Sequence, residues 1–174
     1  FLRNQEGTAF LRIIRERSRV SPDRGENMGG EEKKRAGHPR DEELVKAALE
    51  ARAMAYVPYS HYAVGAALLT EEGEIFQGGN IENASYGAAN CAERTAIFRA
   101  VSQGRRKFSA IAVAGGMEGC APEEYAYPCG ICRQVMQEFA GKGFRVLVAR
   151  SVSDYKAYEF QELLPFGFGG ESIR

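Results

Sequence analysis

Histidine is scarce in this chain, and neither sign of charge is in excess. Among 174 residues there are two histidines, and 23 basic residues balance 23 acidic ones. Proteins that bind nucleic acid usually carry a surplus of lysine and arginine for the phosphates. We therefore expect no nucleic-acid partner and a free small molecule as substrate. Neither histidine is expected to bind a metal, because His38 falls in a stretch of disordered composition and His61 is expected to face solvent or a neighbouring chain.

Long apolar runs and a disulfide framework are also missing. No apolar segment approaches the roughly 20 residues that cross a membrane. We expect no secretory signal, because the first residues contain neither a long apolar stretch nor a small-residue cleavage site. The four cysteines include a Cys-x-x-Cys pair, which indicates metal chemistry in a reducing compartment rather than disulfides. These features predict a cytoplasmic protein with no membrane partner.

The first forty residues differ in composition from the rest of the chain. Residues 8–20 have a weak amphipathic pattern, and residues 21–40 are charged and rich in glycine and proline, as disordered linkers are. We expect residues 1–40 to be a disordered N-terminal extension, with Met28 as the true start. An organellar transit segment is the alternative, although its acidic residues count against it. Residues 41–174 are expected to form one domain.

Three cysteines and one glutamate indicate the chemistry of this domain. Cys91 and Glu93 are followed later in the chain by Cys129 and Cys132. Three thiolates can hold one Zn²⁺ and leave its fourth tetrahedral position free for water. Glu93 stands next to the first thiolate, where it can move a proton of that water. A closed structural site has no use for this carboxylate, so the pattern predicts a catalytic zinc site with Glu93 as the catalytic residue.

The spacing of these residues predicts how they meet. If Cys129 opens a helix, Cys132 lies one turn later on the same face. Cys91 and Glu93 are two residues apart and can converge only at a helix N-terminus, for which Asn90 is the expected N-cap. We therefore expect two helix N-termini to point at one metal ion. Their partial positive charge would lower the pKa values of the thiols.

Two further residues are candidates for a role at this site. Arg94 is expected to donate hydrogen bonds to a ligand sulfur and to offset the excess negative charge of three thiolates. A solvated helix arginine is the alternative. Cys120 could act as a fourth ligand and close the site, but its loop lacks zinc-knuckle spacing and Glu93 would then have no role. We therefore leave Cys120 out of the predicted ligand set.

The predicted elements alternate between helices and strands. Strand, helix, strand, helix, strand in succession predicts parallel pairing with right-handed crossovers. We expect an α/β fold, a three-layer α/β/α sandwich whose mixed sheet has about five strands. The predicted helices cover residues 41–55, 91–103 and 129–140. The predicted strands cover residues 62–69, 75–77, 108–114, 145–149 and 155–160, the first two as a hairpin.

Five motif blocks together resemble the small homotetrameric zinc-dependent cytidine deaminases. The resemblance implies that family's fold and one zinc ion per subunit. It also implies hydrolytic deamination of cytidine and deoxycytidine to uridine and deoxyuridine, with release of ammonia, in pyrimidine salvage. A homotetramer with shared active sites is implied as well. The blocks are VPYSHYAVGAAL at 57–68, GNIENASY at 79–86, CAERTAI at 91–97, PCGICRQ at 128–134 and ELLP at 162–165.

The resemblance also assigns roles in substrate binding. Asn80 and Glu82 match the pair that hydrogen-bonds the ribose 3′-hydroxyl, and the backbone of Ala92 matches the group that meets the base carbonyl. Tyr62 stands where the family often has a phenylalanine against the base. The other matches reach a neighbouring subunit. These are Ala84 and Tyr86, toward that subunit's ribose, and Phe168, which closes a pocket from another subunit.

Two other functions compete with this one. A related zinc deaminase that acts on a cytosine-containing antibiotic of the blasticidin type shares the core motifs, although the Asn80 and Glu82 block favours a plain ribose. A non-catalytic module stabilised by zinc would use all four cysteines as ligands. Ammonia release from cytidine, deoxycytidine and blasticidin separates the first two functions. A tight zinc site without turnover would support the third.

Overall fold

The structure is a computed structural model, and it describes residues 38–173, apart from the side chain of Glu171. The expected disordered extension lies almost wholly outside the described residues, and the expected start at Met28 lies entirely outside them. Within residues 38–173, no helix is both long and apolar enough to cross a membrane.

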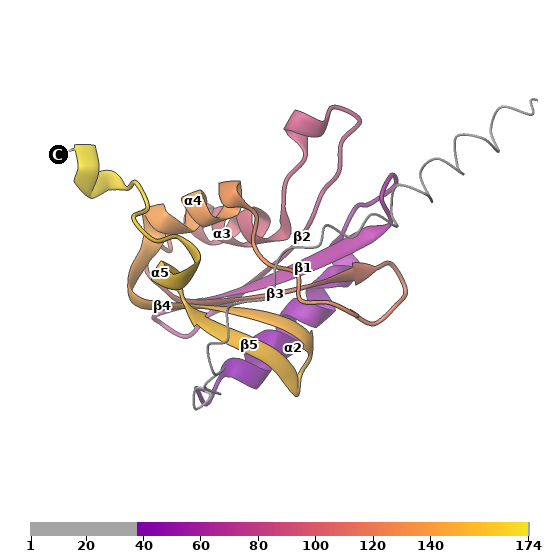
Figure 1. The fold of residues 1–174 in the computed structure, drawn as a ribbon, viewed down its shortest axis with the longest axis horizontal. Coiled ribbons are helices and arrows are strands. Elements are labelled where there is room, and N and C mark those ends of the chain that lie inside the picture. The colour runs from indigo at the N-terminus through magenta and orange to yellow at the C-terminus, as the bar shows by residue number, and fades with distance from the viewer. Residues whose placement is uncertain (1–37, 174) are drawn as a thin grey trace, which may run out of the picture. The chain divides into compact units, whose positions relative to one another are not determined.

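A mixed sheet of five strands forms the middle layer (Figure 1). Its strand order is β2-β1-β3-β4-β5. The pair β3–β4 is parallel, and the other three pairs are antiparallel. The predicted mixed sheet is confirmed. The strands are β1 (Tyr62–Thr70), β2 (Ile75–Gly79), β3 (Phe108–Met117), β4 (Ala140–Ser151) and β5 (Asp154–Glu159).

One part of the predicted pairing is wrong. The helix between β3 and β4 joins parallel neighbours, as expected, but the strands on either side of the preceding helix, β2 and β3, do not pair. β1 lies between them and is antiparallel to both. The physical reason is that β1 is almost wholly buried and pairs along both of its edges, which leaves β2 at the edge of the sheet.

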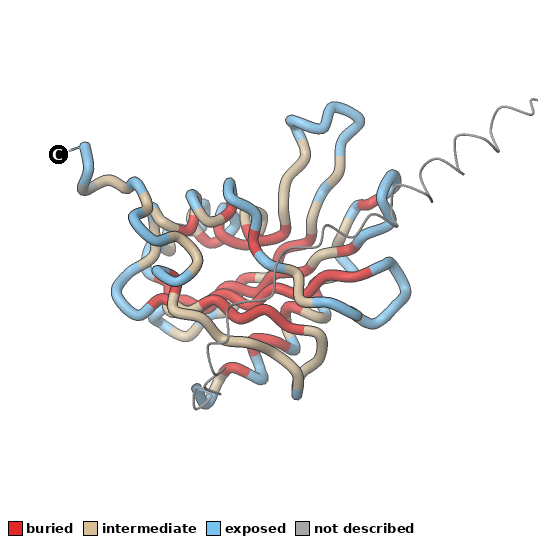
Figure 2. The backbone as a smooth tube through the Cα atoms, in the orientation of Figure 1, coloured by how far each residue is buried: buried red, intermediate tan, exposed pale blue. Residues whose placement is uncertain are grey.

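The helices cover both faces of the sheet (Figure 1). Side chains alternate between the faces of a strand, so in β4 Leu147 packs in the cluster with α2, whereas Val146 packs in the cluster with α3 and α4. Both clusters are deeply buried (Figure 2). The predicted three layers are therefore present. The helices are α2 (Asp41–Ala51), α3 (Ala92–Ser102), α4 (Gly130–Phe139) and the short α5 (Phe160–Leu163).

Element boundaries differ from the expected ones chiefly where glycine occurs. β3 extends to Met117 because Gly115 and Gly116 continue the ladder with Val64 and Ala63 of β1. The sequence placed the end of this strand at Ala114, since glycine disfavours strands when its partners are unknown. The first helix ends at Ala51 and continues as a 3₁₀ turn, η1 (Arg52–Met54).

Glycine lets the helices approach the sheet closely. A Cβ atom on Gly78 of β2 would lie 2.5 Å from the backbone nitrogen of Ala96 in α3. A Cβ atom on Gly65 of β1 would lie 2.2 Å from the carbonyl oxygen of Ala48 in α2. Neither distance is possible for a real side chain, so both helices need glycine beneath them. The contact at Gly78 fixes the distance between α3 and the sheet, and the first turn of α3 belongs to the candidate site.

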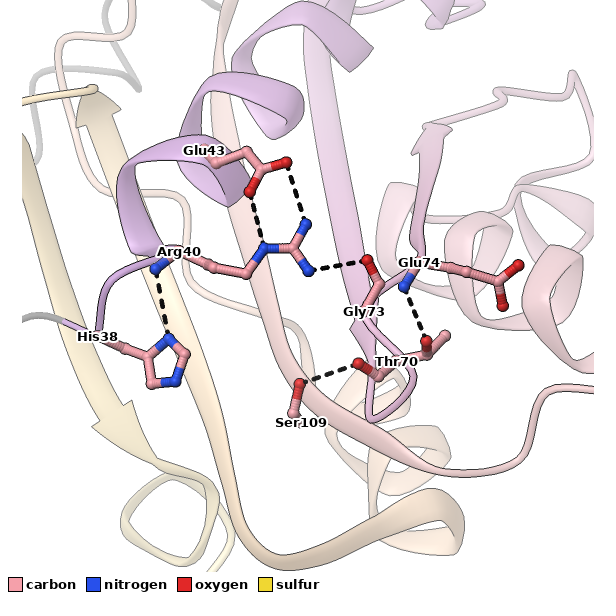
Figure 3. Close-up of polar contacts among 7 residues, drawn as sticks. All are labelled: His38, Arg40, Glu43, Thr70, Gly73, Glu74 and Ser109. Atoms are coloured by element: carbon pink, nitrogen blue, oxygen red, sulfur yellow. Dashed lines mark hydrogen bonds and ion pairs between the residues drawn. The ribbon is translucent and has the colours of Figure 1, made fainter.

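Polar contacts tie the start of α2 to the turn between β1 and β2 (Figure 3). The guanidinium of Arg40 donates to both carboxylate oxygens of Glu43, at 2.8 and 3.0 Å, and to the carbonyl oxygen of Gly73, at 2.8 Å. Gly73 has φ +90°, a conformation that suits glycine in a turn. The hydroxyl of Thr70 accepts from the backbone N–H of Glu74 at 3.1 Å. This end of the hairpin is thus closed by several satisfied hydrogen bonds.

A buried ion pair joins α2 to β4. Arg145 lies two residues before Leu147, so its side chain points to the same face of the sheet, toward α2. Its Nη1 donates to both carboxylate oxygens of Asp41, at 2.8 and 2.9 Å. The backbone N–H of His38 donates to the same carboxylate at 2.9 Å. Asp41 is only 1% exposed, so these donors replace the water that it loses.

Candidate metal centre and active site

Two helices begin at the predicted ligands. Cys91 is the N-cap of α3, and Cys129 is the N-cap of α4. The expectation that Asn90 caps α3 is wrong by one residue. Instead, the Asn90 side chain donates to the hydroxyl of Thr95 at 3.0 Å. Because an N-cap residue has extended backbone angles, each of the two cysteines stands at the open end of its helix, where the backbone N–H groups carry partial positive charge.

The three sulfurs meet at a spacing that suits zinc. Their Sγ atoms all lie within 4.8 Å of one another, and those of Cys91 and Cys129 are 3.8 Å apart. A tetrahedral ion with Zn–S bonds of about 2.3 Å needs ligand sulfurs about 3.8 Å apart. Cys132 is buried, whereas Cys129 is exposed. The group is therefore positioned to bind a metal ion on one side of the domain.

The other candidate ligands stay away from this group. Among the described residues, Cys120 is not part of the sulfur cluster, and its side chain is exposed. The side chain of His61 is 62% exposed and lies 3.6 Å from the Glu118 carboxylate. Soft sulfur donors without a carboxylate or imidazole favour zinc over magnesium or calcium.

The charges of the sulfurs depend on one another. The pKa of Cys91 is lowered to about 5, chiefly by a hydrogen bond from Cys132, with smaller contributions from Arg94 and Cys129 and with burial acting against them. The same contact with Cys91, together with burial, raises the pKa of Cys132. Cys91 and Cys132 therefore do not both ionise unaided. A divalent cation would allow all three to be thiolates, which is how metal binding couples to proton release.

Glu93 is buried beside the sulfur group. It is only 4% exposed, and its side chain contacts that of Cys132. Loss of water raises the pKa of the Glu93 carboxyl to about 7, and the negative charge of Cys91 acts in the same direction. A carboxyl with this pKa is present in both its protonated and ionised forms near neutral pH, as a proton carrier must be.

Arg94 lies against the first ligand sulfur. Its Nη2 is 3.6 Å from Sγ of Cys91 and donates to the carbonyl oxygen of Ala89 at 3.2 Å. Its Nε is buried and has no hydrogen-bond partner among the described residues. The guanidinium therefore lies against the cluster, and its role toward the ligand sulfur stays a prediction.

A cleft of about 540 Å³ opens above the sulfurs. Sites for small molecules usually measure about 300–1,000 Å³, so the size of this cleft suits a small molecule. The predicted residues Tyr62, Asn80, Glu82, Tyr86 and Ala92 line this cleft, as do Cys91, Glu93 and Arg94.

Two predicted substrate residues lie apart from the cleft of their own chain. Ala84 is exposed in the loop before η2 (Tyr86–Ala88). Phe168 is 60% exposed after α5, and its carbonyl oxygen accepts from Nε2 of Gln134 at 2.8 Å. Neither lines the cleft. This placement is compatible with the expectation that both residues serve a neighbouring subunit.

Strand β1 and the loop before it hold the polar residues of the cleft. Oδ1 of Asn80 accepts from the N–H of Val64 at 2.8 Å, and Nδ2 donates to the carbonyl oxygen of Tyr62 at 3.0 Å. Oε2 of Glu82 accepts from the N–H groups of Tyr59 and Ser60, at 3.0 and 3.2 Å. Tyr59 and Ser60 were not among the residues predicted for the site, although their place in the motif block at 57–68 indicated a role there.

Tyr127 also lines the cleft, although the sequence did not predict it as a site residue. Its side chain borders the cleft next to Cys129. Its hydroxyl lies 2.9 Å from that of Tyr158 in β5, and the two rings pack at 5.9 Å between centroids. The Pro-Cys-x-x-Cys motif that follows it gave no hint of this contact, because β5 lies far along the chain.

Comparison with known proteins decides the family. The family described as "Cytidine and deoxycytidylate deaminase zinc-binding region" matches residues 38–148. The chain belongs to this family. The cytidine deaminase family predicted from the motif blocks is confirmed, and so is the zinc-binding character of the domain that holds the sulfur group.

Several relatives of this deaminase chain are similar over nearly their whole length. A cytidine deaminase from Halalkalibacterium halodurans is 48% identical over 130 residues, covering 75% of this chain and 95% of that protein. One from Sporosarcina psychrophila is 46% identical, covering 76% and 93%. The crystal structure of cytidine deaminase from Burkholderia pseudomallei matches with a TM-score of 0.66 and 45% identity, covering 72% and 97%. A blasticidin-S deaminase from Bacillus cereus is more distant, at 33% identity over 132 residues.

Proposed function

We propose that this chain is a zinc-dependent cytidine deaminase. It would convert cytidine and deoxycytidine to uridine and deoxyuridine and release ammonia. The observation that supports this most is the buried Glu93 carboxyl beside three sulfurs, in a cleft whose size suits a small molecule. The blasticidin-type alternative is weaker, since that relative is less similar than the cytidine deaminases.

Cys91, Cys129 and Cys132 would hold one zinc ion per subunit. Bound zinc supplies a water molecule whose pKa is lowered toward neutrality. The protein prepares this site by placing two of the ligands at helix N-termini, which favour the thiolate form. Arg94, 3.6 Å from the Cys91 sulfur, offsets part of the negative charge that three thiolates bring.

Glu93 would carry the protons of the reaction. Its carboxylate takes a proton from the attacking water and passes it to ring N3 of cytosine. The oxygen of that water becomes bonded to C4. Glu93 then takes the remaining proton from the oxygen on C4 and delivers it to the amino nitrogen. The bond from this nitrogen to C4 breaks as the C4 carbonyl forms, and ammonia leaves. Burial supports this role, because it brings the pKa of the carboxyl to about 7.

The lining residues would orient the nucleoside. The ring of Tyr62 lies against the base, and the backbone N–H of Ala92, at the start of α3, meets the base carbonyl. Asn80 and Glu82 hold the ribose 3′-hydroxyl. Both have capacity left: Nδ2 of Asn80 donates one of its two hydrogens to Tyr62, and the backbone donors to Glu82 both bind Oε2.

Subunits would complete one another's sites in a homotetramer. Ala84 and Tyr86 would reach a neighbouring ribose, and Phe168 would close the pocket of another subunit. Tyr86 borders the cleft of its own chain, and at 85% exposed its ring is also accessible to a neighbouring subunit. Light scattering of the purified protein tests this assembly. A monomer with full activity would contradict it.

We infer that residues 41–174 form the deaminase domain, with residues 1–40 as an extension. The family match, which begins at residue 38, supports this boundary. We place the enzyme in the cytoplasm, in pyrimidine salvage, with a free nucleoside and no nucleic acid as its substrate. The balanced charge of the chain supports the choice of substrate.

The decisive experiment combines a zinc count with ammonia release. Wild-type protein should contain one zinc per chain and release ammonia from cytidine and deoxycytidine. Release from blasticidin alone would favour the antibiotic-acting alternative. A full zinc complement without turnover of any of the three compounds would support a non-catalytic module.

A further inference from the structure

Ser60 occupies a junction between two groups of the cleft. Its hydroxyl accepts a hydrogen bond from the backbone N–H of Tyr62 at 3.0 Å. The backbone N–H of Ser60 donates to Oε2 of Glu82 at 3.2 Å, and the Ser60 hydroxyl is the largest cause of the lowered pKa of that carboxyl. One hydroxyl can accept and donate at the same time. Ser60 therefore links the residue proposed to meet the base with the residue proposed to hold the ribose.

The backbone of the same turn adds to this clamp. The N–H groups of Tyr59 and Ser60 both donate to Oε2 of Glu82, at 3.0 and 3.2 Å. Two backbone donors from consecutive residues thus converge on one carboxylate oxygen, beside the Ser60 hydroxyl. His61, the next residue, has φ +55°, an unusual conformation for a residue other than glycine. The chain thereby turns back within one residue, which brings the N–H of Tyr62 to the Ser60 hydroxyl.

We propose that Ser60 is a positioning residue for ribose recognition, which it serves by fixing the Glu82 carboxylate and the start of β1 together. This inference rests on the proposed function, in which Glu82 binds the 3′-hydroxyl. A carboxylate that is already held in place loses little conformational freedom when the substrate binds, so its hydrogen bond contributes more to affinity. Ser60 itself need not touch the nucleoside.

The test compares two nucleosides and two substitutions. Ser60→Ala removes the hydroxyl, whereas Ser60→Thr keeps it at an exposed position where the extra methyl group has room. The substrates are cytidine and 3′-deoxycytidine, which lacks the hydroxyl that Glu82 would bind. The measured quantities are kcat and KM for each nucleoside, together with zinc content and melting temperature.

We expect Ser60→Ala to raise the KM for cytidine about tenfold, as loss of a hydrogen bond to a charged group does. Its kcat should stay within about twofold of the wild-type value, because Glu93 and the metal ligands are untouched. The KM for 3′-deoxycytidine should not change. Ser60→Thr should restore the wild-type KM for cytidine.

Three results would overturn the inference. An unchanged KM for cytidine in Ser60→Ala would show that the hydroxyl is dispensable. An equal rise for both nucleosides, with a lower melting temperature, would assign Ser60 a merely structural role. A Glu82→Gln variant that still prefers cytidine to 3′-deoxycytidine as strongly as the wild type would show that Glu82 does not contact the 3′-hydroxyl, while leaving deamination intact. Failure of the proposed function looks different: wild-type protein with full zinc would then turn over neither nucleoside.

Discussion

The two ends of strand β1 handle polar groups in opposite ways. At the Thr70 end, the Arg40 guanidinium contacts both Glu43 and Gly73, and Asp41 is paired with Arg145. At the Tyr62 end, three sulfurs crowd together, the buried Glu93 has a raised pKa, and Nε of Arg94 lacks a partner among the described residues. The first end is built for stability. The second keeps polar groups in an environment that only a cation and a substrate complete.

Of the changes at the two ends of β1, Glu93→Gln should have the largest effect on turnover. The amide keeps the shape of the side chain but cannot carry protons, so we expect turnover of cytidine to fall by roughly 10³-fold or more. Zinc content should remain at the wild-type level. The melting temperature should stay the same or rise, because a buried ionisable group has been replaced by a neutral one. Turnover above a tenth of the wild-type rate would remove Glu93 from its proposed role.

Arg94→Gln should have the next largest effect. Groups that hydrogen-bond a metal ligand typically change affinity or activity about 10- to 100-fold. We therefore expect weaker zinc binding in competition with a chelator, and lower turnover at saturating zinc. Arg99→Gln is a suitable control, because Arg99 is an exposed arginine of the same helix, α3. A variant that keeps both zinc affinity and full turnover would show that Arg94 is only structural.

Asp41→Ala should have the opposite profile. It leaves Arg145 without its carboxylate next to the buried face of α2, so we expect a loss of about 3 kcal/mol in the free energy of unfolding. The kcat for cytidine and the zinc content should be unchanged at a temperature where the variant is folded. Denaturant unfolding and turnover, measured on one preparation, check both statements. A variant with normal stability but lower kcat would mean that the two ends of β1 are not independent.

Glu43 gives the smallest expected effect, and it depends on pH. Hydrogen bonding to Arg40 lowers the pKa of Glu43 from its usual 4.5. A carboxyl whose pKa is lower in the folded state adds stability above its unfolded pKa and loses it as the pH falls through the folded value. The wild-type protein should therefore melt slightly higher than Glu43→Gln at pH 7, and this difference should shrink below pH 4.5. The pair is exposed, so salt should also reduce the difference. A difference that grows at low pH would contradict the assignment.

The sequence predicted the reactive end better than the supporting one. Cys91, Cys129, Cys132 and Glu93 could be placed together because their chemistry restricts where they can stand and because a helix turn relates the last two cysteines. The contact between Asp41 and Arg145, which are 104 positions apart, left no trace in the local pattern. Such pairs depend on which strand faces which helix, and this is decided only when the sheet assembles.

The same limit explains the errors in the predicted fold. Hydrophobic pattern located all five strands, but it could not show that β1 would separate β2 from β3. The start of α3 was misplaced by one residue because Asn90 is a good capping residue in isolation. In the structure Asn90 is engaged with Thr95, so Cys91 takes the cap position. Local preference was overruled in each case by contacts between distant segments.

Because Gly78 has no side chain, α3 lies directly on strand β2, and the chemistry is sensitive to a change in the strand beneath this helix. A single methyl group there would collide with the backbone of α3 at Ala92 and Ala96, and the helix would have to lift away from β2. Cys91 and Glu93 would move with it, whereas Cys129 and Cys132 belong to another helix and would stay. The smallest possible enlargement of one edge strand would thus pull the metal ligands out of register without altering any of them.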